Sequence, residues 1–493
     1  MPEAVLSLDQ GTTGSTALVF SREGKIIGRA YSEFTQSYPQ PGWVEHDPDE
    51  IFAVSLQVMT DALEVAHIQP SELKAIGIAN QRETTVVWDR DTGRPIHPAI
   101  VWQSRQTTDI CQQLKKDGHE EMIRERTGLV IDAYFSGTKL KWILDRYPDA
   151  RAKARDGKVV FGTIDTWLLW KLSGGVLATE PTNASRTLLY NIHERQWDQD
   201  LLDLLDVPRD MLPEVKASCS VFAETCQRDR LPGGVPIAGI AGDQQAALYG
   251  QGCWSPGMAK NTYGTGSFVV MNMGALRPPV QPGLLTTICC DESGQPAYAL
   301  EGSIFVAGAA IQWLRDELGL IVKASDTESI ARSVPDTLGV HVVPAFTGLG
   351  APHWDMEARG AILGLTRGAG RAHIVRATLE SLAYQTCDVV DAMTACGADI
   401  RELRVDGGAA ANEFLMQFQA DLLGVPVDRP TILETTASGV AFLAGLSTGF
   451  WSSPEEIQSV RRRDRLFEPM LGSAEREQML AGWKQALSRV RTN

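Results

Sequence analysis

Two turns rich in glycine and threonine are the first feature of this sequence with chemical meaning. Residues 11–15 read GTTGS and residues 264–267 read GTGS, and each stretch separates two short runs that are expected to be strands. Glycine lets a ligand approach the backbone closely, and successive amides with hydroxyl side chains form a concavity that binds anions. A simple hairpin explains either turn taken alone. Two such turns half a chain apart predict a pair of loops that face one polyphosphate.

Two aspartates stand where predicted strands end. Asp9 belongs to the end of the apolar run 4–8, and Asp243 follows the run 235–240 and precedes an expected helix. A helix N-cap is the simpler role for Asp243. Open α/β sheets, however, bind ligands at the carboxyl ends of their strands. There, two carboxylates could hold Mg²⁺, often through water, and one could accept a proton from a hydroxyl group.

An adjacent pair of opposite charges, Arg82 and Glu83, follows a third predicted strand. Exposed pairs of this kind are common and stabilise proteins little. A small polyol would nevertheless need a charged donor beside a charged acceptor, because each hydroxyl group both donates and accepts. Three aromatic residues could line such a site, although core packing is the simpler explanation of each: Trp102, Tyr134 and Phe268.

The elements that must position these residues alternate between strands and helices, which indicates an α/β or mixed architecture. Strands are expected at 4–8, 16–20 and 26–27, joined as an antiparallel series of hairpins. Asp47 is expected to cap the helix that follows, and Glu50 to complete a capping box.

A run of small residues, DGGAAAN at 406–412, follows a predicted strand at 403–405 and opens a further helix. Small side chains there would let a flat ring or a ribose lie against the backbone. A tight strand-to-helix turn explains the same residues equally well.

The order of strand, glycine–threonine turn and strand occurs in both halves of the chain. The interval is too long for a solenoid repeat, so it indicates two related halves. Glycine, tryptophan, serine and proline cluster at 250–257 and mark the best boundary. We therefore expect two domains, residues 1–251 and residues 252–493.

The composition is that of a globular protein with an acidic balance. Of 493 residues, 43% are hydrophobic and 22% are charged, and 61 acidic side chains against 46 basic ones give a net charge of −15. This balance argues against nucleic-acid binding, so an anionic substrate would need a local positive potential from a metal, backbone amides or a few arginines. No run of 18 apolar residues predicts a membrane span, and no basic leader is evident.

The eight cysteines have no regular spacing, so they are expected to be reduced thiols of a cytoplasmic protein. Several common motifs are absent from the sequence: the Walker-type GxxxxGK[ST], a GxGxxG after a strand, HExxH and GxSxG. The two glycine–threonine turns are therefore the main candidates for phosphate binding.

Longer strings carry a resemblance to a known family. They include SLDQGTT at 7–13, NQRET at 80–84, YFSGTK at 134–139, GIAGDQQAA at 239–247, NTYGTG at 261–266 and VDGG at 405–408. With these strings the chain resembles bacterial glycerol kinases, of the FGGY carbohydrate kinase family, from Ser7 to about Trp483. The resemblance implies two related domains of the actin/sugar-kinase/Hsp70 (ribonuclease H-like) fold with a cleft between them.

The resemblance also implies an activity, the phosphorylation of glycerol by ATP to sn-glycerol 3-phosphate, with Asp243 as the base. The implied glycerol-binding residues are Arg82, Glu83, Trp102, Tyr134, Asp243, Gln244 and Phe268. The implied ATP/ADP-binding residues are Thr12, Thr13, Gly14 and Thr265 at the phosphates, and Gly308, Gln312, Gly408 and Asn412 around the nucleotide. Asp9 and Asp243 would support Mg²⁺. A homodimer or homotetramer is also implied.

The sequence departs from the family pattern at one of the two turns. The family usually reads TTSSR where residues 12–16 of this chain read TTGST, so Thr16 replaces an arginine and Gly14 lacks a hydroxyl. The loop 226–236 lacks the patterns associated with fructose 1,6-bisphosphate or phosphotransferase control in relatives. Two alternative functions are a kinase of the same family that acts on another polyol or a ketose, and a nucleotide-driven chaperone or filament protein.

Overall fold

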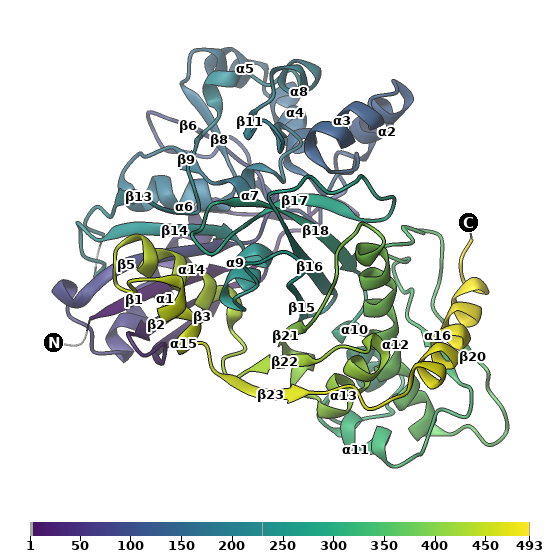
Figure 1. Ribbon diagram of the computed structural model, residues 1–493. Helices are drawn as coiled ribbons and strands as arrows, with labels where there is room; N and C mark the ends of the chain where they lie inside the picture. Colours follow the sequence, from purple (N-terminus) through teal and green to yellow (C-terminus); the bar gives the residue numbers. More distant parts are fainter. Residues whose placement is uncertain (1–2, 229, 493) are drawn as a thin grey trace. The chain divides into compact units, whose positions relative to one another are not determined.

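The computed structural model describes residues 3–228 and 230–492, which form two compact units (Figure 1). The first unit comprises Met1–Trp254, Thr286–Tyr298 and Thr435–Arg461. The second comprises Ser255–Leu285, Ala299–Glu434 and Arg462–Asn493. The chain thus returns twice to the first unit, whereas the sequence interpretation placed a single boundary after residue 251.

The first unit is built on a six-stranded sheet with the order β13-β14-β5-β1-β2-β3. Its strands are β1 (Ala4–Gln10), β2 (Gly14–Ser21), β3 (Ile26–Glu33), β5 (Leu73–Asn80), β13 (Cys219–Glu224) and β14 (Pro236–Gly242). Strands β1, β2 and β3 form the expected antiparallel hairpins, while β1 and β14 both lie parallel to β5. The carboxyl ends of β1, β5 and β14 therefore share one edge.

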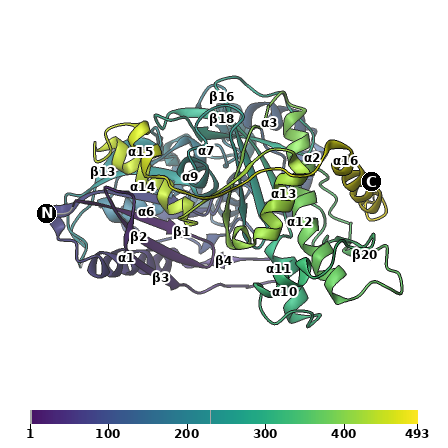
Figure 2. The same ribbon diagram turned by 60° about the horizontal axis from the view of Figure 1, so that its bottom comes forward.

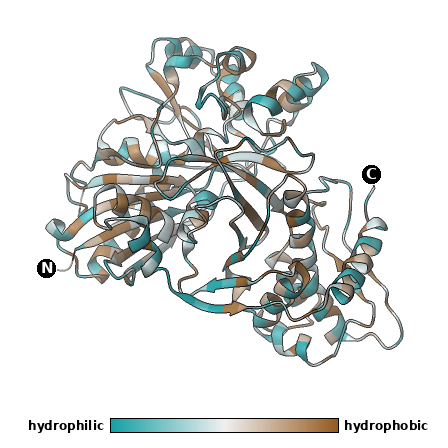
Figure 3. Ribbon diagram, viewed as in Figure 1, coloured by the Kyte–Doolittle hydropathy of each residue, from teal (hydrophilic) through white to brown (hydrophobic). Residues whose placement is uncertain are grey.

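Helices cover both faces of this sheet, so its central strands are apolar nearly throughout (Figure 3). The main helices of the unit are α1 (Pro48–Val65), α2 (Thr108–Lys116), α3 (Glu120–Thr127), α4 (Ser136–Arg146), α5 (Pro148–Arg155), α6 (Ile164–Ser173), α7 (Pro181–Ala184), α8 (Gln199–Leu205), α9 (Asp243–Gly250), α14 (Thr435–Ser447) and α15 (Pro454–Val460). Leu6, Ile76 and Ile78 share a core with residues of α1 and α6. The opposite face lies against α14.

Glycines allow α14 to pack very close to the sheet. A Cβ atom at Gly77 would lie 2.2 Å from the carbonyl oxygen of Val440, and one at Gly239 would lie 2.4 Å from the amide nitrogen of Ala444. A Cβ atom at Gly439 would lie 1.9 Å from the carbonyl oxygen of Ala246, on α9. Helix α9 is thus clamped through backbone contacts that no larger residue would permit.

The start of α1 confirms one expectation and corrects another. Asp47 caps the helix, because its carboxylate accepts hydrogen bonds from the amides of Asp49 and Glu50. Glu50 does not complete a capping box. Its Oε1 instead accepts hydrogen bonds from the amide and the hydroxyl of Thr35, at 3.0 and 2.9 Å, and so ties the loop after β3 to the helix.

The second unit repeats the strand pattern of the first. Its strands are β15 (Ala259–Tyr263), β16 (Ser267–Gly274), β21 (Leu403–Gly407), β22 (Val427–Pro430), β23 (Arg463–Phe467) and, from Ala299 on, β18 (Pro296–Ile304). Strand β17 (Leu285–Cys290) belongs to the first unit from Thr286 on. Strand β15 pairs antiparallel with β16 and parallel with β21, as β1 pairs with β2 and β5. The α/β class and the repeated hairpin are therefore confirmed.

Five helices complete the second unit: α10 (Gly308–Asp316), α11 (Asp326–Arg332), α12 (Arg371–Thr394), α13 (Glu413–Leu423) and α16 (Ser473–Ser488). Helices α12 and α13 lie side by side (Figure 2). The rings of Tyr384 and Trp483 stack at 5.2 Å, which joins α16 to this core. All eight cysteines are free. Within residues 3–228 and 230–492, no helix is both long and apolar enough to cross a membrane.

Candidate active site

The predicted functional residues of the first unit gather at the edge where β1, β5 and β14 end. The pairing of the strands brings Gln10, Asn80 and Gly242 into register. The turn 11–13 follows the first of these residues, Gln81-Arg82-Glu83 follows the second, and Asp243 follows the third. Residues that are far apart in the sequence thus meet because parallel strands end at a common edge.

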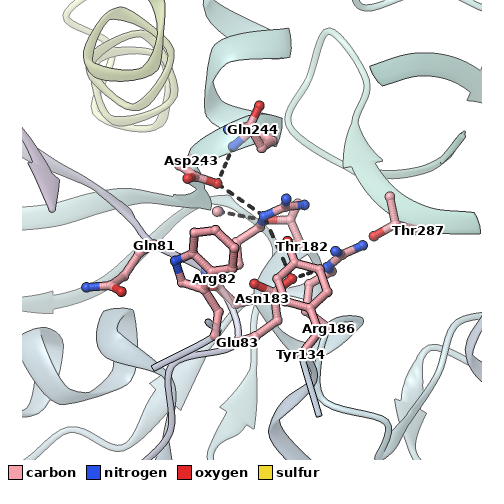
Figure 4. A network of polar contacts seen from close by, with 12 residues as sticks. Gln81, Arg82, Glu83, Tyr134, Thr182, Asn183, Arg186, Asp243, Gln244 and Thr287 are labelled. Atoms are coloured by element: carbon pink, nitrogen blue, oxygen red, sulfur yellow. Dashed lines mark hydrogen bonds and ion pairs between the residues drawn. The ribbon is translucent and has the colours of Figure 1, made fainter. Parts of the chain in front are cut away.

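Asp243 and Arg82 form an ion pair at this edge (Figure 4). Arg82 Nε lies 3.1 Å from Asp243 Oδ1, and the side chain of Asp243 is 30% exposed whereas that of Arg82 is 2% exposed. Arg82 also donates a hydrogen bond to Gln245 Oε1 at 3.3 Å. A Cβ atom at Gly242 would lie 2.7 Å from Arg82 Cγ and Cδ, so the arginine crosses this glycine.

Asp243 is not the N-cap of α9, which was the simpler interpretation of its position. Gly242 occupies that place, and Asp243 is the first helical residue. Its Oδ1 accepts a hydrogen bond from the amide of the next residue, Gln244, at 2.7 Å. The carboxylate is therefore held at the helix start and remains accessible, so it could accept a hydrogen bond or a proton from a hydroxyl group.

Glu83 is buried in an unusual backbone conformation. Its φ of +62° lies in the left-handed region, which costs a non-glycine residue about 1–2 kcal/mol. Its carbonyl oxygen accepts hydrogen bonds from Ser136 Oγ at 3.0 Å and Lys139 Nζ at 3.1 Å. Its carboxylate lies 2.5 Å from Arg186 Nε and 4.0 Å from Arg82 Nε. The interpretation of Arg82 and Glu83 as a solvated surface pair is therefore wrong.

Lys139, Arg186 and Gln245 belong to this cluster, although the sequence patterns did not single them out. Burial lowers the pKa of the Lys139 ammonium group to about 7, against the effect of the Glu83 carboxylate. The helical spacing could have indicated that Lys139 is buried. Lys139 precedes the apolar Ile143 by one helical turn, so both side chains lie on the same face of α4. Arg186 gave no comparable signal because it follows a short helix without periodicity.

Aromatic side chains join this cluster to the first glycine–threonine turn. The rings of Trp102 and Tyr134 meet edge to face at 5.5 Å, and the Arg186 guanidinium lies 5.5 Å from the centre of the Tyr134 ring. Trp102 Nε1 donates a hydrogen bond to Thr12 Oγ1 at 2.9 Å. Tyr134 and Trp102 therefore belong to the charged cluster rather than to plain core, and Trp102 also orients a hydroxyl of the turn.

Steric contacts explain why residue 14 is a glycine. A Cβ atom there would lie 2.7 Å from the carbonyl oxygen of Ser32 and 2.8 Å from a ring carbon of Tyr31. Tyr31 stands opposite Thr16 in the β2–β3 pair. Thr13 is exposed in the same turn, whereas its carbonyl oxygen accepts a hydrogen bond from the amide of Phe34 at 3.4 Å. Gly14, one of the two residues that depart from the family pattern, thus leaves room for a tyrosine on the adjacent strand.

Asp9 lies close enough to Asp243 for their charges to interact. Burial and the Asp243 carboxylate together raise the pKa of Asp9 to about 7. Two carboxylates whose repulsion is relieved by a proton are also a fitting place for a divalent cation, which prefers oxygen ligands. In the described part of the chain no cluster of three or more acidic, histidine or cysteine side chains could hold a metal. A cation here would therefore share its coordination with a ligand or water.

We expect Asp9→Asn to stabilise the protein in the absence of divalent cations. The raised pKa means that Asp9 destabilises the folded state progressively as the pH rises from about 4 to about 7, and constantly above that. The substitution should raise the free energy of unfolding by roughly 1 kcal/mol or more at pH 8, and by less at pH 5. Calorimetric unfolding in EDTA measures this, with the exposed Asp156→Asn as control. An equal gain at both pH values would contradict the assignment.

The second glycine–threonine turn is held by the start of α10. The amide of Gly308 donates to the carbonyl of Gly264 and the amides of Ala307 and Ala309 donate to the carbonyl of Thr265, all at 2.9 to 3.0 Å. A Cβ atom at Gly308 would lie 2.6 Å from the Gly264 oxygen. Gly308 is thus required for this close approach, and Thr265 remains exposed.

The other predicted nucleotide residues also lie in the second unit. Gly408 follows β21, and a Cβ atom at this position would have no neighbour within 4 Å, so its backbone faces open space. Asn412 caps α13 through a hydrogen bond from the amide of Leu415 at 3.0 Å, and its Nδ2 donates to Thr327 at 3.1 Å. Gln312 is exposed on α10, and Phe268 is half-buried on β16. The hydrogen bonds of Asn412 therefore give it a structural role as the N-cap of α13.

Comparisons with known proteins decide the family. The N-terminal domain of the FGGY family of carbohydrate kinases matches residues 4–250, and the C-terminal domain matches residues 259–448. The chain belongs to the FGGY family of carbohydrate kinases. This FGGY chain is 59% identical over 489 residues to the glycerol kinase of Pseudomonas syringae pv. syringae (strain B728a), covering 99% of this chain and 96% of that one. It is 58% identical over 493 residues to the glycerol kinase of Petrotoga mobilis (strain DSM 10674 / SJ95), covering 100% and 99%.

Solved structures agree with the FGGY assignment. The structure of Plasmodium falciparum glycerol kinase with ADP is 36% identical, with a TM-score of 0.93 over 99% of this chain and 98% of that one. The xylulose kinase of Lactobacillus acidophilus matches with a TM-score of 0.87 at 21% identity, over 99% and 98%, and shows the shared fold alone. The predicted fold class and family are therefore confirmed.

Proposed function

We propose that this FGGY kinase transfers the terminal phosphoryl group of ATP to glycerol and forms sn-glycerol 3-phosphate and ADP. Relatives that are 58–59% identical over nearly the whole chain are glycerol kinases. The observation that carries the proposal within this chain is the accessible Asp243 carboxylate, 3.1 Å from the buried Arg82 and beside the buried Glu83. Charged donors and acceptors this close suit a small molecule that carries a hydroxyl on every carbon.

The glycerol site in this proposal uses both charges and rings. Arg82 donates to hydroxyl oxygens, while Glu83 and Asp243 accept from hydroxyl groups. Tyr134 and Gln244 provide further polar contacts. Trp102 and Phe268 pack against the carbon chain. The edge-to-face pair of Trp102 and Tyr134 supports this arrangement, because it presents apolar surface next to the charged cluster.

The nucleotide in this proposal is held mainly by backbone and hydroxyl groups. Thr12, Thr13 and Gly14 bind phosphate in the first turn and Thr265 binds phosphate in the second, whereas Gly308, Gln312, Gly408 and Asn412 surround the nucleoside. Asp9 and Asp243 support the Mg²⁺ that accompanies ATP. When bound, the cation offsets phosphate charge, which a protein of net charge −15 would otherwise repel.

Asp243 removes the proton from the attacking hydroxyl of glycerol. Its contacts with Arg82 and with the Gln244 amide are both made by Oδ1, so we assign the proton to Oδ2. The glycerol oxygen forms its bond to the γ-phosphorus as the bond from that phosphorus to the ADP oxygen breaks. Because little covalent help is needed, alignment and charge stabilisation supply most of the rate.

A second candidate function is a kinase for another polyol or a ketose. A coupled assay of ADP formation separates the two with a panel of glycerol, dihydroxyacetone, xylulose, ribitol and gluconate. We expect kcat/KM for glycerol to exceed that for every other compound by at least about 100-fold, which corresponds to about 2.7 kcal/mol. A higher value for a ketose would replace glycerol as substrate. ATP hydrolysis that glycerol leaves unchanged would indicate a chaperone or filament protein instead.

A further inference from the structure

A buried hydrogen-bond network lies directly behind the residue that precedes Asp243. Gly242 ends β14, and its amide donates a hydrogen bond to Thr182 Oγ1 at 2.8 Å. The Thr182 hydroxyl in turn donates to Glu180 Oε1 at 2.6 Å. Thr182 and Glu180 are both 0% exposed. Both lie at the start of the short helix α7, and Figure 4 shows Thr182 beside the charged cluster.

The hydroxyl of Thr182 has its direction fixed by its partners. A hydroxyl group has one hydrogen, and the backbone amide of Gly242 can only donate. The Thr182 hydrogen therefore points to Glu180, which turns a lone pair toward the amide of Gly242.

Both carboxyl oxygens of Glu180 accept more than one hydrogen bond. Its Oε1 accepts from the amide and Nδ2 of Asn183 at 2.7 and 3.0 Å, in addition to Thr182. Its Oε2 accepts from the amide of Thr182 at 2.8 Å and from Ser218 Oγ at 2.6 Å. Burial nevertheless raises the pKa of Glu180 to about 7. Five hydrogen bonds thus hold this buried carboxyl group in one orientation.

Asn183 ties the same network to the neighbouring strand. Its side-chain amide exchanges two hydrogen bonds with that of Asn80, at 2.9 and 3.0 Å. Asn80 ends β5 in register with Gly242 on β14. Asn183 also opens an N-x-S glycosylation sequon, but it is 0% exposed, so the sequon serves packing here. The ends of β5 and β14 are thus both fastened to the segment 180–183.

We propose that Thr182, oriented by Glu180, is a positioning residue that fixes Gly242 and thereby aims the carboxylate of Asp243. The inference rests on the proposed function, because it assumes that Asp243 is the base. Gly242 has no side chain of its own to anchor it, and Arg82 crosses it at a distance that leaves no room for one. Beside the pairing of β14 with β5, its amide is therefore the contact that sets its place. A displacement of about 1 Å at a reacting group can cost about 100-fold in rate.

The test compares three substitutions in the full-length protein. Thr182→Val keeps the shape but removes the hydroxyl, and Thr182→Ser restores it. Ser218→Ala is the matched control, because it removes a buried hydrogen bond to the other oxygen of Glu180 and leaves Gly242 untouched. We expect Thr182→Val to lower kcat at least tenfold with both KM values within twofold. Thr182→Ser should recover kcat to within threefold, and Ser218→Ala should lose comparable thermal stability with kcat within threefold.

The outcomes separate this inference from the proposed function. Wild-type kcat in Thr182→Val, or an equal loss in Ser218→Ala, would overturn the positioning role. Thr182→Ala, which also removes the hydroxyl but places no extra methyl group against the Gly242 amide, gives a second measurement if Thr182→Val does not fold, and wild-type kcat in that variant would also overturn it. Asp243→Asn is assayed alongside. If that variant remains active, the proposed base is wrong, whatever Thr182 does.

Discussion

Replacing Asp243 by asparagine should lower glycerol-dependent turnover by about 10²–10⁴-fold, the usual contribution of a general base. The substitution is structurally mild. An asparagine Oδ1 can still accept hydrogen bonds from Arg82 and from the Gln244 amide, which the aspartate accepts at 3.1 and 2.7 Å. What it loses is the ability to take up a proton. The effect should therefore fall on kcat, with the KM for glycerol changed far less.

The measurement is initial rates with Mg·ATP and glycerol, together with calorimetric titration of ADP into the variant. ADP affinity within about threefold of wild type would show that the nucleotide site is intact. Asp47→Asn is the matched control, because Asp47 also stands at a helix start and caps it, outside the charged cluster. That control should keep full activity. Turnover of Asp243→Asn within tenfold of wild type would remove Asp243 from the role of base.

Much of the site could be predicted from the sequence because it lies at strand ends. Apolar runs followed by polar residues or glycine marked the ends of β1, β5 and β14, and parallel pairing then placed Asp9, Arg82 and Asp243 at one edge. The repeated glycine–threonine turn likewise indicated two related halves of the chain. In each case a local pattern determined the position, and a general rule of sheet topology supplied the proximity.

Other parts of the site could not be predicted in this way. Helix α14 belongs to the first unit although it lies near the end of the chain, and its hydrophobicity all round gives no face that could identify its partners. Only the close contacts at Gly77 and Gly239 reveal where it packs. The sequence analysis did not single out Glu180 and Thr182, because their importance arises from a contact with Gly242, some 60 residues later in the sequence.

The burial of the charged residues was even harder to predict from the sequence. An arginine next to a glutamate is usually a solvated pair, and nothing local distinguishes Arg82 and Glu83 from such a pair. Their burial follows from a second cation, Arg186, which lies 2.5 Å from Glu83. Lys139 adds a hydrogen bond to the Glu83 carbonyl and holds its left-handed backbone. Sequence alone could suggest a polyol pocket but not the charges that balance it.

Replacing Arg82 by alanine should lower kcat/KM for glycerol at least about 100-fold. Arg82 is the charged donor in the proposed glycerol site, and hydrogen bonds to charged groups contribute about 1.5–3 kcal/mol each. Its loss also leaves Asp243 without the guanidinium at 3.1 Å and Glu83 with one cation fewer. Glycerol should bind poorly, because its hydroxyl oxygens lose this donor while both acidic groups remain with less compensating charge.

Arg82→Ala will also lower the stability of the protein. The loss of activity therefore needs a control variant that loses a comparable ion pair. Arg126→Ala removes an ion pair to the buried Asp198, at 2.7 Å, and should lower the melting temperature while leaving the KM for glycerol unchanged. Arg82→Lys should retain part of the activity, since it keeps the charge but loses the planar guanidinium that serves Asp243 and Gln245 together. Glycerol kinetics of Arg82→Ala that match those of Arg126→Ala would show that Arg82 acts only in folding. A selective loss in the Arg82 variants would place it in contact with the substrate.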